Sequence, residues 1–388
     1  MNRAEHREIT ESFYKYQVRY FEILGLWQLR PDATKRQQML HLLRYLLFLG
    51  IVSVMLVFFA IHVLANIDQL TVIMQVFFLF ATEMSCMVKL LSIRLRRREH
   101  AQLLDEMHSS VFRPRTAEET LTFKGAAQMA INMRNYYGAM SIQAAALLLV
   151  MQWFVDSSAL PLVMYEPCDL ANSSCYYVLY TYHLLSLLPT CWLNIAFDSM
   201  SQALLNFLRA QLVMLSMRLE NLGAALTPLD DHRIAKELRE CCVYYARIER
   251  LRDMVDGFIK IPGSVQLFCT ILVLVSNFYE MSTHADETAF IMKIVTYQFA
   301  MLLQIFIVCN AANEVTYQSS LLGHTLYNSE WTTWNKDNRK MCLLMMLRFD
   351  DPLWVRTINH TQSFSLPTFS SIVNCSYSYF ALLKRVNS

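Results

Sequence analysis

The sequence is short of charge, glycine and proline. Only 17% of its 388 residues are charged and 55% are hydrophobic, whereas about a quarter of a soluble domain is charged. Its 8 glycines and 9 prolines are few enough to leave long helices uninterrupted. A net charge of +2 argues against a nucleic-acid partner. The composition therefore predicts a helical membrane protein.

Motifs of common enzymes are also missing. The sequence contains no G-x-S-x-G, H-E-x-x-H, P-loop or dinucleotide-binding fingerprint. Its 10 cysteines form no CxxC pair, and no His/Cys cluster has metal-ligand spacing. The polar N-terminus shows no cleavable signal peptide. We therefore expect no enzymatic activity, no metal and no cofactor.

Apolar residues gather in runs of about 20, the length at which a helix crosses a hydrocarbon core. The seven runs are approximately Leu42–Leu64, Leu70–Ile93, Tyr136–Val155, Tyr176–Asp198, Phe258–Tyr279, Thr288–Asn310 and Phe364–Leu383. They predict an all-α fold, a single polytopic domain of seven transmembrane helices over residues 1–388.

Amphipathic stretches with helical spacing follow the fourth run, precede the fifth and follow the sixth. We interpret them as helices that continue out of the bilayer and pack on one another. Ordinary surface helices are the alternative.

Basic residues indicate the orientation. Lys and Arg accumulate on the cytoplasmic side of short loops. Here they lie in the N-terminal region and in the second, fourth and sixth connections, while the first, third and fifth connections have none. We therefore expect the N-terminus inside the cell and the C-terminus outside, the inverse of a G-protein-coupled receptor.

The third connection is thus expected outside the cell. It holds a glycosylation sequon at Asn172. Cys168 and Cys175 flank its polar part and could pair in oxidising surroundings. Two further sequons, at Asn359 and Asn374, fall inside the cell and inside a span, so we expect both to be unmodified.

Ionisable residues inside membrane segments are functional candidates by default. Glu83 and Lys89 lie in the second run, six residues apart and therefore on different faces of its helix. We interpret Asp198, at the inner end of the fourth run, as an interfacial residue. The paired or inverted halves of a transporter are not evident.

Large adaptable side chains gather in the outer halves of several runs. Aromatic and Met surfaces with few polar groups suit small, mostly apolar ligands. Helix packing with an interfacial aromatic belt is the alternative, and it is favoured for any one residue. The candidate ligand-binding residues are Met74, Phe77, Phe78, Leu149, Trp153, Tyr180, His183, Leu187, Tyr297 and Met301.

The last run carries a stripe of residues spaced by four: Ser370, Asn374, Ser378, Leu382 and Val386. Such residues share one helix face, and their polar groups would be costly against lipid. The stripe therefore either faces a shared axis, where hydroxyls and an amide can touch hydrated cations, or bonds to neighbouring helices within the chain.

From Cys309 to Ser388 the sequence resembles the insect odorant receptor family. The shared elements are a Tyr-x-x-x-Trp pattern, a basic start to an apolar helix, and closing Thr-Phe and Ser-Tyr pairs. Here these are Tyr327 and Trp331, Arg339-Lys340, Thr368-Phe369 and Ser378-Tyr379. The length and the inverted seven-span layout agree over the whole chain. The acidic "RFDDP" departs from the Gln-Lys of many members, which puts in doubt any contact that needs a basic residue there.

The resemblance implies an odorant receptor that works as a subunit of a ligand-gated, non-selective cation channel. Four subunits would surround one pore, combining this subunit with a shared olfactory co-receptor. The last helix, about 364–386, would line the pore, with Leu382 and Val386 as a hydrophobic constriction. Cytoplasmic parts at about 201–256 and 311–350 would form the anchor between subunits.

On the same resemblance, the protein would bind odorant small molecules and lie among lipids as a multi-pass protein of the plasma membrane of olfactory sensory neurons. The alternatives are a metabotropic seven-helix chemoreceptor and a gustatory-type receptor.

Overall fold

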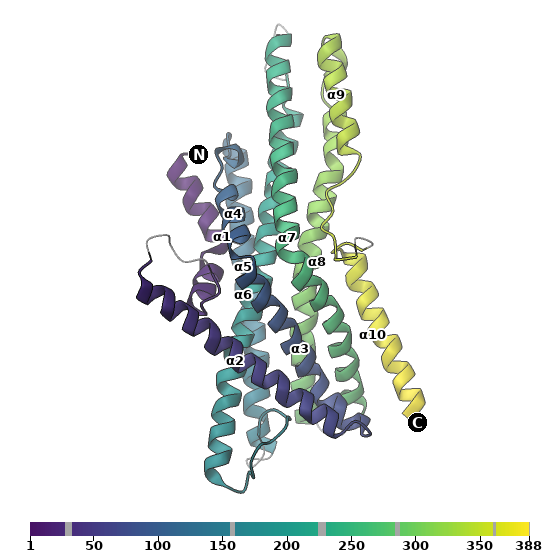
Figure 1. The fold of residues 1–388 in the computed structure, drawn as a ribbon. Coiled ribbons are helices and arrows are strands. Elements are labelled where there is room, and N and C mark those ends of the chain that lie inside the picture. Colours follow the sequence, from purple (N-terminus) through teal and green to yellow (C-terminus); the bar gives the residue numbers. More distant parts are fainter. Residues whose placement is uncertain (28–32, 156–159, 224–229, 284–287, 360–361, 388) are drawn as a thin grey trace.

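The computed structural model describes residues 1–27, 33–155, 160–223, 230–283, 288–359 and 362–387, apart from the side chains of 151–155, 289 and 383–387. Over these residues the chain is helical, with one isolated β-bridge between Arg356 and Ser363. The elements (Figure 1) are α1 (Arg3–Ile23), α2 (Lys35–Ala65), α3 (Leu70–Leu95), α4 (Arg97–Met107), η1 (Ser110–Phe112), α5 (Ala117–Val155), α6 (Ser173–Glu220), α7 (Asp231–Thr283), α8 (Thr288–Tyr327), η2 (Trp331–Thr333), α9 (Lys336–Phe349) and α10 (Leu366–Asn387). The predicted all-α class is confirmed.

Each predicted apolar run falls within a single helix. The first two runs lie in α2 and α3, the next four in α5 to α8, and the last in α10, which begins at Leu366 instead of Phe364. By length and composition of the described residues, α2, α3, α7 and α8 could each cross a membrane. The apolar parts of α5, α6 and α10 also contain polar residues, and several of those on α5 and α6 belong to the site described below.

The longest helices are far longer than a bilayer core is thick. α7 has 53 residues and α6 has 48. At a rise of about 1.5 Å per residue, α7 spans about 80 Å, against about 30 Å of hydrocarbon. Figure 1 shows α7 running through the height of the molecule, with α9 beside its upper part. The predicted amphipathic stretches are thus continuous with the helices that contain the apolar runs; that they leave the bilayer stays a prediction.

An aromatic cluster packs the upper part of the bundle. The ring of Phe207 on α6 meets Phe13, Phe112 and Phe123 edge-on, with centroids 5.5, 5.9 and 5.6 Å apart. These three residues lie on α1, η1 and α5. Edge-to-face aromatic pairs contribute beyond the area that they bury. The N-terminal helix is thereby docked onto the extension of α6.

An ion pair reinforces the same region. Arg218 Nε on α6 donates to Glu119 Oε1 on α5 at 2.8 Å, and both side chains are largely buried. The guanidinium also lies over the ring of Tyr244 on α7, 4.3 Å from its centroid. Burial alone would lower the pKa of Arg218, yet its hydrogen bonds to Glu119 leave that pKa raised. Arg218 thus joins three helices as a permanent cation.

The last helix packs along α7 and α8 at the edge of the bundle (Figure 1). Just before α10 begins, Phe364 packs closely on Gly263 of α7, where a Cβ would lie 2.8 Å from Cζ of Phe364. The ring of Phe364 is buried against the backbone at this point. The absence of a side chain at Gly263 therefore sets how closely the start of α10 approaches α7.

We predict opposite effects for Ala at two glycines of α7. Replacing a helical Gly by Ala stabilises by about 0.5–1 kcal/mol when the site is open. Nothing lies within 4 Å of a Cβ at Gly257, so Gly257→Ala should hold or raise the melting temperature of the detergent-solubilised protein. Gly263→Ala should lower it, because the Phe364 ring must move. Equal shifts in melting temperature for both variants would show that the close contact between Gly263 and Phe364 does not affect stability.

Candidate functional site

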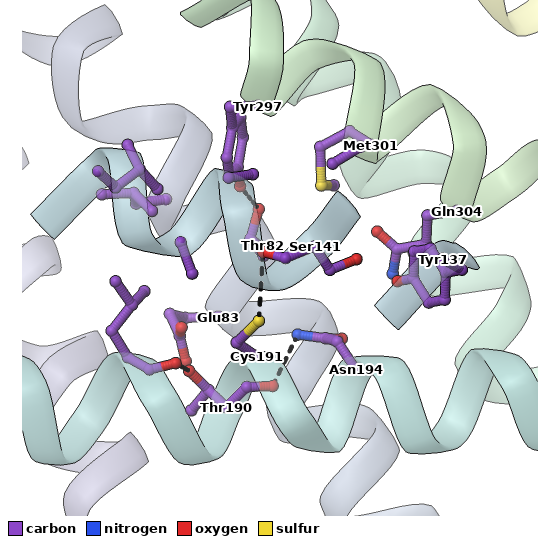
Figure 2. A pocket seen from close by; sticks show the side chains of 16 residues that line it. Thr82, Glu83, Tyr137, Ser141, Thr190, Cys191, Asn194, Tyr297, Met301 and Gln304 are labelled. Carbon is purple, nitrogen blue, oxygen red and sulfur yellow. Dashed lines mark hydrogen bonds between the residues drawn. The ribbon is translucent and has the colours of Figure 1, made fainter. Parts of the chain in front are cut away.

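A cavity of about 60 Å³ lies between α3, α5, α6 and α8 (Figure 2). One part of its wall is apolar, including Leu79, Leu148, Leu187 and Met301. The remainder is lined by the small residues Ala144, Ala145 and Ala300 and by the polar or thiol-bearing residues Thr82, Glu83, Tyr137, Ser141, Thr190, Cys191, Asn194, Tyr297 and Gln304. An apolar chamber with a few polar groups is the usual design of a small-molecule site.

A hydrophobic layer, here called the outer cluster, packs over the apolar part of the wall. Its buried members come from six helices and from the α5–α6 connection: Met55, Phe59, Val76, Phe78, Leu79, Ala81, Leu148, Leu149, Leu162, Met164, Leu187, Cys269, Val273, Tyr297 and Met301. The connection is tied down by the amide of Tyr165, which donates to the carbonyl of Phe58 at 3.3 Å. Leu162 and Met164 thus pack into the same core as the residues around the cavity.

A buried ion pair lies on the polar side of the cavity. Lys89 Nζ on α3 donates to both carboxylate oxygens of Asp198 on α6 at 2.9 Å, and the two side chains are 0% and 1% exposed. Asp198 also accepts from Tyr137 of α5 at 3.1 Å and from Gln304 of α8 at 2.6 Å. Lys89 further donates to Asn194 at 2.8 Å. Four helices therefore meet at one satisfied charge pair.

This network corrects one prediction. Asp198 is not an interfacial residue, since it is enclosed by α3, α5 and α8. Glu83 and Lys89, six residues apart on α3, both lie near α6. Lys89 binds Asp198 on α6, and Glu83 lies beside Thr190 of the same helix (Figure 2). The spacing of two residues on one helix does not show whether the same neighbouring helix contacts both of them.

Of the predicted ligand-binding residues, Leu187, Tyr297 and Met301 line the cavity. Two others stand directly behind the wall. Phe78 packs edge-on against Tyr297 with centroids 5.1 Å apart, and Leu149 is buried in the outer cluster. The structure thus brings half of the predicted set together.

The remaining predicted residues lie elsewhere. Met74 accepts a hydrogen bond from Ser276 on α7 at 3.7 Å, and Phe77 packs on Phe80 of its own helix. Tyr180 stacks on Tyr176 near the start of α6, and His183 is fully buried without lining the cavity. The side chain of Trp153 lies outside the described residues.

Sequence reasoning missed the polar lining. Tyr137, Asn194 and Gln304 reach both the cavity and the ion pair, and none of them was a candidate. The available signal was their placement, because each is a hydrogen-bonding residue inside an apolar run. Such residues in membrane helices generally face the bundle interior.

The stripe on α10 faces away from the rest of the chain. Ser370, Asn374, Ser378 and Leu382 are all exposed, and Leu382 is 59% exposed. The opposite face packs on the bundle, as where Phe369 meets Phe306 of α8 at 5.6 Å between centroids.

The hydroxyl of Ser378 donates to the carbonyl of Asn374 in its own helix at 2.9 Å. Among the described contacts, the stripe makes no hydrogen bond to a neighbouring helix, so internal bonding does not account for it. The side chain of Val386 lies outside the described residues.

The α5–α6 connection ends in a short covalent loop. Cys168 and Cys175 are joined by a disulfide, with their Cα atoms 6.3 Å apart. Between them, Asn172 caps α6, because its side-chain oxygen accepts from the amide of Ser174 at 3.0 Å. Asn172 is exposed. The asparagine of the sequon is therefore exposed at the N-terminus of α6.

The comparisons with known proteins agree with one another. A family profile described as 7tm Odorant receptor matches residues 69–377. Odorant receptor 46a of Drosophila melanogaster is similar in both isoforms. Isoform B is 50% identical over 98% of this chain and 100% of the relative, and isoform A is 40% identical over 98% and 99%.

Two solved structures share the fold. The insect olfactory receptor OR5 from Machilis hrabei superimposes with a TM-score of 0.85 at 17% identity, covering 96% of this chain and 97% of that one. Its complex with eugenol superimposes with a TM-score of 0.85 at 16% identity, covering 99% and 98%.

We predict that the Lys89–Asp198 pair behaves as a coupled unit. Lys89→Met or Asp198→Asn alone should destabilise by about 3–5 kcal/mol, because each leaves an uncompensated buried charge. The double variant removes both charges and should recover much of that loss. The measurement is thermal unfolding of the solubilised protein together with its amount at the cell surface. Strictly additive losses in the double variant would contradict the coupling.

Proposed function

Because the chain belongs to the 7tm odorant receptor family, we propose that it is the odorant-binding subunit of a ligand-gated, non-selective cation channel. As a member of that family it is a multi-pass membrane receptor and not an enzyme. The observation that carries the proposal is the cavity among α3, α5, α6 and α8. The fold that holds it matches that of a receptor solved with eugenol bound.

The cavity suits small, mostly apolar odorants. Pockets for drug-sized molecules measure about 300–1,000 Å³, and this one measures about 60 Å³. Binding would therefore require side chains of the wall to move. Met301 and Leu187 are suited to this, since flexible apolar side chains repack around ligands at little cost. In this proposal the outer cluster loosens when an odorant enters.

The arrangement in the membrane follows from charge and fold together. We assign seven spans to α2, α3, α5, α6, α7, α8 and α10, with the N-terminus in the cytoplasm and the C-terminus outside. The starts of α3 and α6 lie at one end of the molecule, and those of α7 and α9 lie at the other (Figure 1). The loops without Lys or Arg precede α3 and α6, and the basic segments adjoin α7 and α9.

Glycosylation tests this orientation. Asn172 should carry a glycan, because the assignment places it outside the cell, and Asn359 should carry none although both are exposed sequons. Glycosidase treatment should change the gel mobility of the wild type and leave Asn172→Gln unchanged. A shift that survives Asn172→Gln and disappears in Asn359→Gln would reverse the assigned orientation.

The partner would be a second receptor subunit. The parts at 201–256 and 311–350 would form the cytoplasmic anchor between subunits, and four subunits, including a shared co-receptor, would surround one pore. The rigid packing around Phe207 and Arg218 supports a structural role for this region. The location would be the plasma membrane of olfactory sensory neurons.

The exposed stripe of α10 is the proposed pore lining. Ser370, Asn374 and Ser378 would offer polar groups to hydrated cations, and Leu382 with Val386 would form a constriction that closes by losing water. Leu382 is exposed in the single chain and is therefore available to face the equivalent residues of neighbouring subunits. Lipid would cover it equally well, and the currents described below distinguish the two arrangements.

The decisive experiment records whole-cell current during an odorant panel, with and without a co-receptor. The proposal predicts odorant-evoked cation current only when both subunits are present. In the same cells, Leu382→Ser should raise the current without odorant because the constriction stays wet. Asn374→Asp should shift the reversal potential towards that of divalent cations.

Leu43→Ser on α2 is the matched control, because Leu43 is as exposed as Leu382 and lies on another helix; it should leave the leak unchanged. Wild-type leak and selectivity in both stripe variants, at normal surface levels, would remove the stripe from the pore. Odorant responses that need a G protein and no co-receptor would instead favour a metabotropic receptor.

A further inference from the structure

One carboxyl group in the cavity has no role in the ion pair. Glu83 lies on α3, six residues before Lys89, and is 2% exposed. Its side chain borders the cavity beside Thr190 (Figure 2). Its Oε2 atom is buried and has no hydrogen-bond partner among the described residues. Buried polar atoms are almost always paired, so an exception of this kind needs an explanation.

The cations nearby do not provide one. Lys89 is already bound by both oxygens of Asp198 and by Asn194. The residues that line the cavity include no Lys and no Arg. A partner for the Oε2 atom of Glu83 must therefore come from outside the described protein groups, and the cavity is the space that this carboxyl group borders.

The remaining polar groups show which kind of partner fits. The hydroxyl of Thr82 donates to the carbonyl of Phe78 at 2.9 Å. It also lies 2.6 Å from the hydroxyl of Tyr297. Because the proton of Thr82 is already used, Tyr297 is the donor of this second hydrogen bond and Thr82 accepts. The hydroxyl of Thr190 donates to carbonyls of its own helix at 3.0 Å.

Two further donors of the wall are directed at the ion pair. Tyr137 and Gln304 both donate to Asp198. These two donors are occupied, whereas the Oε2 atom of Glu83 is left without a partner. A ligand that brings its own donor therefore finds a partner in this oxygen.

We propose that Glu83 is a specificity-determining residue that selects apolar odorants carrying a hydrogen-bond donor, a hydroxyl or an amine, over otherwise equal molecules that carry none. The proposal rests on the proposed function, because it concerns the ligand of the same cavity. The hydrocarbon part of the ligand lies against Leu79, Leu187 and Met301, and its donor reaches Glu83. Leaving a buried acceptor unpaired is what disfavours the donor-free molecule.

Isomers test this with shape and composition held nearly constant. The probes are 1-hexanol against methyl pentyl ether and benzyl alcohol against anisole, applied to cells that express the receptor with a co-receptor. The readout is the ratio of half-maximal concentrations, ether over alcohol. A hydrogen bond to a buried carboxyl predicts a ratio of about tenfold or more for the wild type.

Removing the acceptor should abolish the preference. Glu83→Leu and Glu83→Met should both bring the ratio close to one, and the Met variant keeps the length of the side chain if the Leu variant folds poorly. Asp68→Asn is the control, since Asp68 is exposed before α3 and its charge lies outside the cavity. It should leave the ratio at the wild-type value.

The two sources of a donor are separated with 1-hexylamine. A response to the amine that exceeds that to 1-hexanol and is lost in Glu83→Gln assigns an ammonium ligand, because Gln keeps an acceptor without the charge. A stronger response to 1-hexanol that survives in Glu83→Gln assigns a hydroxyl.

Three results would overturn the role of Glu83 while leaving the channel in place. They are a wild-type ratio near one, a ratio unchanged in surface-expressed Glu83→Met, and responses to other odorants but to no alcohol or amine. Absence of any odorant-evoked current with the co-receptor would instead overturn the proposed function itself.

Discussion

The buried pair of Lys89 and Asp198 sets the relative position of four helices. Two opposite charges without water contact are tolerated only when geometry and further hydrogen bonds satisfy them. Here Tyr137 of α5 and Gln304 of α8 complete the shell of Asp198. Sliding any one of these helices along its axis would break a bond that no solvent replaces. The cavity beside the pair therefore has a fixed polar end and a deformable apolar end.

α8 joins this site to the last helix. It contributes Tyr297, Met301 and Gln304 to the cavity wall. Two residues after Gln304, Phe306 packs against Phe369 on α10. α10 otherwise rests on α7, where Gly263 allows Phe364 to approach the backbone. Under the proposed function, a shift of α8 caused by a ligand would act directly on the helix that carries the pore stripe.

Part of the candidate site was predictable and part was not. Leu187, Tyr297 and Met301 are large apolar residues in membrane runs, so composition pointed to them correctly. Phe77, Tyr180 and Met74 have the same character and lie elsewhere, because which side of a helix faces a cavity depends on its neighbours. The role of Asp198 was misjudged for a related reason: position in a run does not reveal whether another helix covers the residue.

The sequence by itself determined the class of the protein, the positions of its apolar runs along the chain, and the likeness to odorant receptors. These properties are local, since they depend on runs of hydrophobic residues, on the distribution of Lys and Arg and on short motifs. Only the tertiary structure decided that Lys89 pairs with Asp198, that Glu83 borders a cavity without a partner, and that the α10 stripe is exposed. Those facts arise from contacts between different helices; Lys89 and Asp198, for example, are more than 100 residues apart in the sequence. Periodicity within one helix carries no information about such contacts.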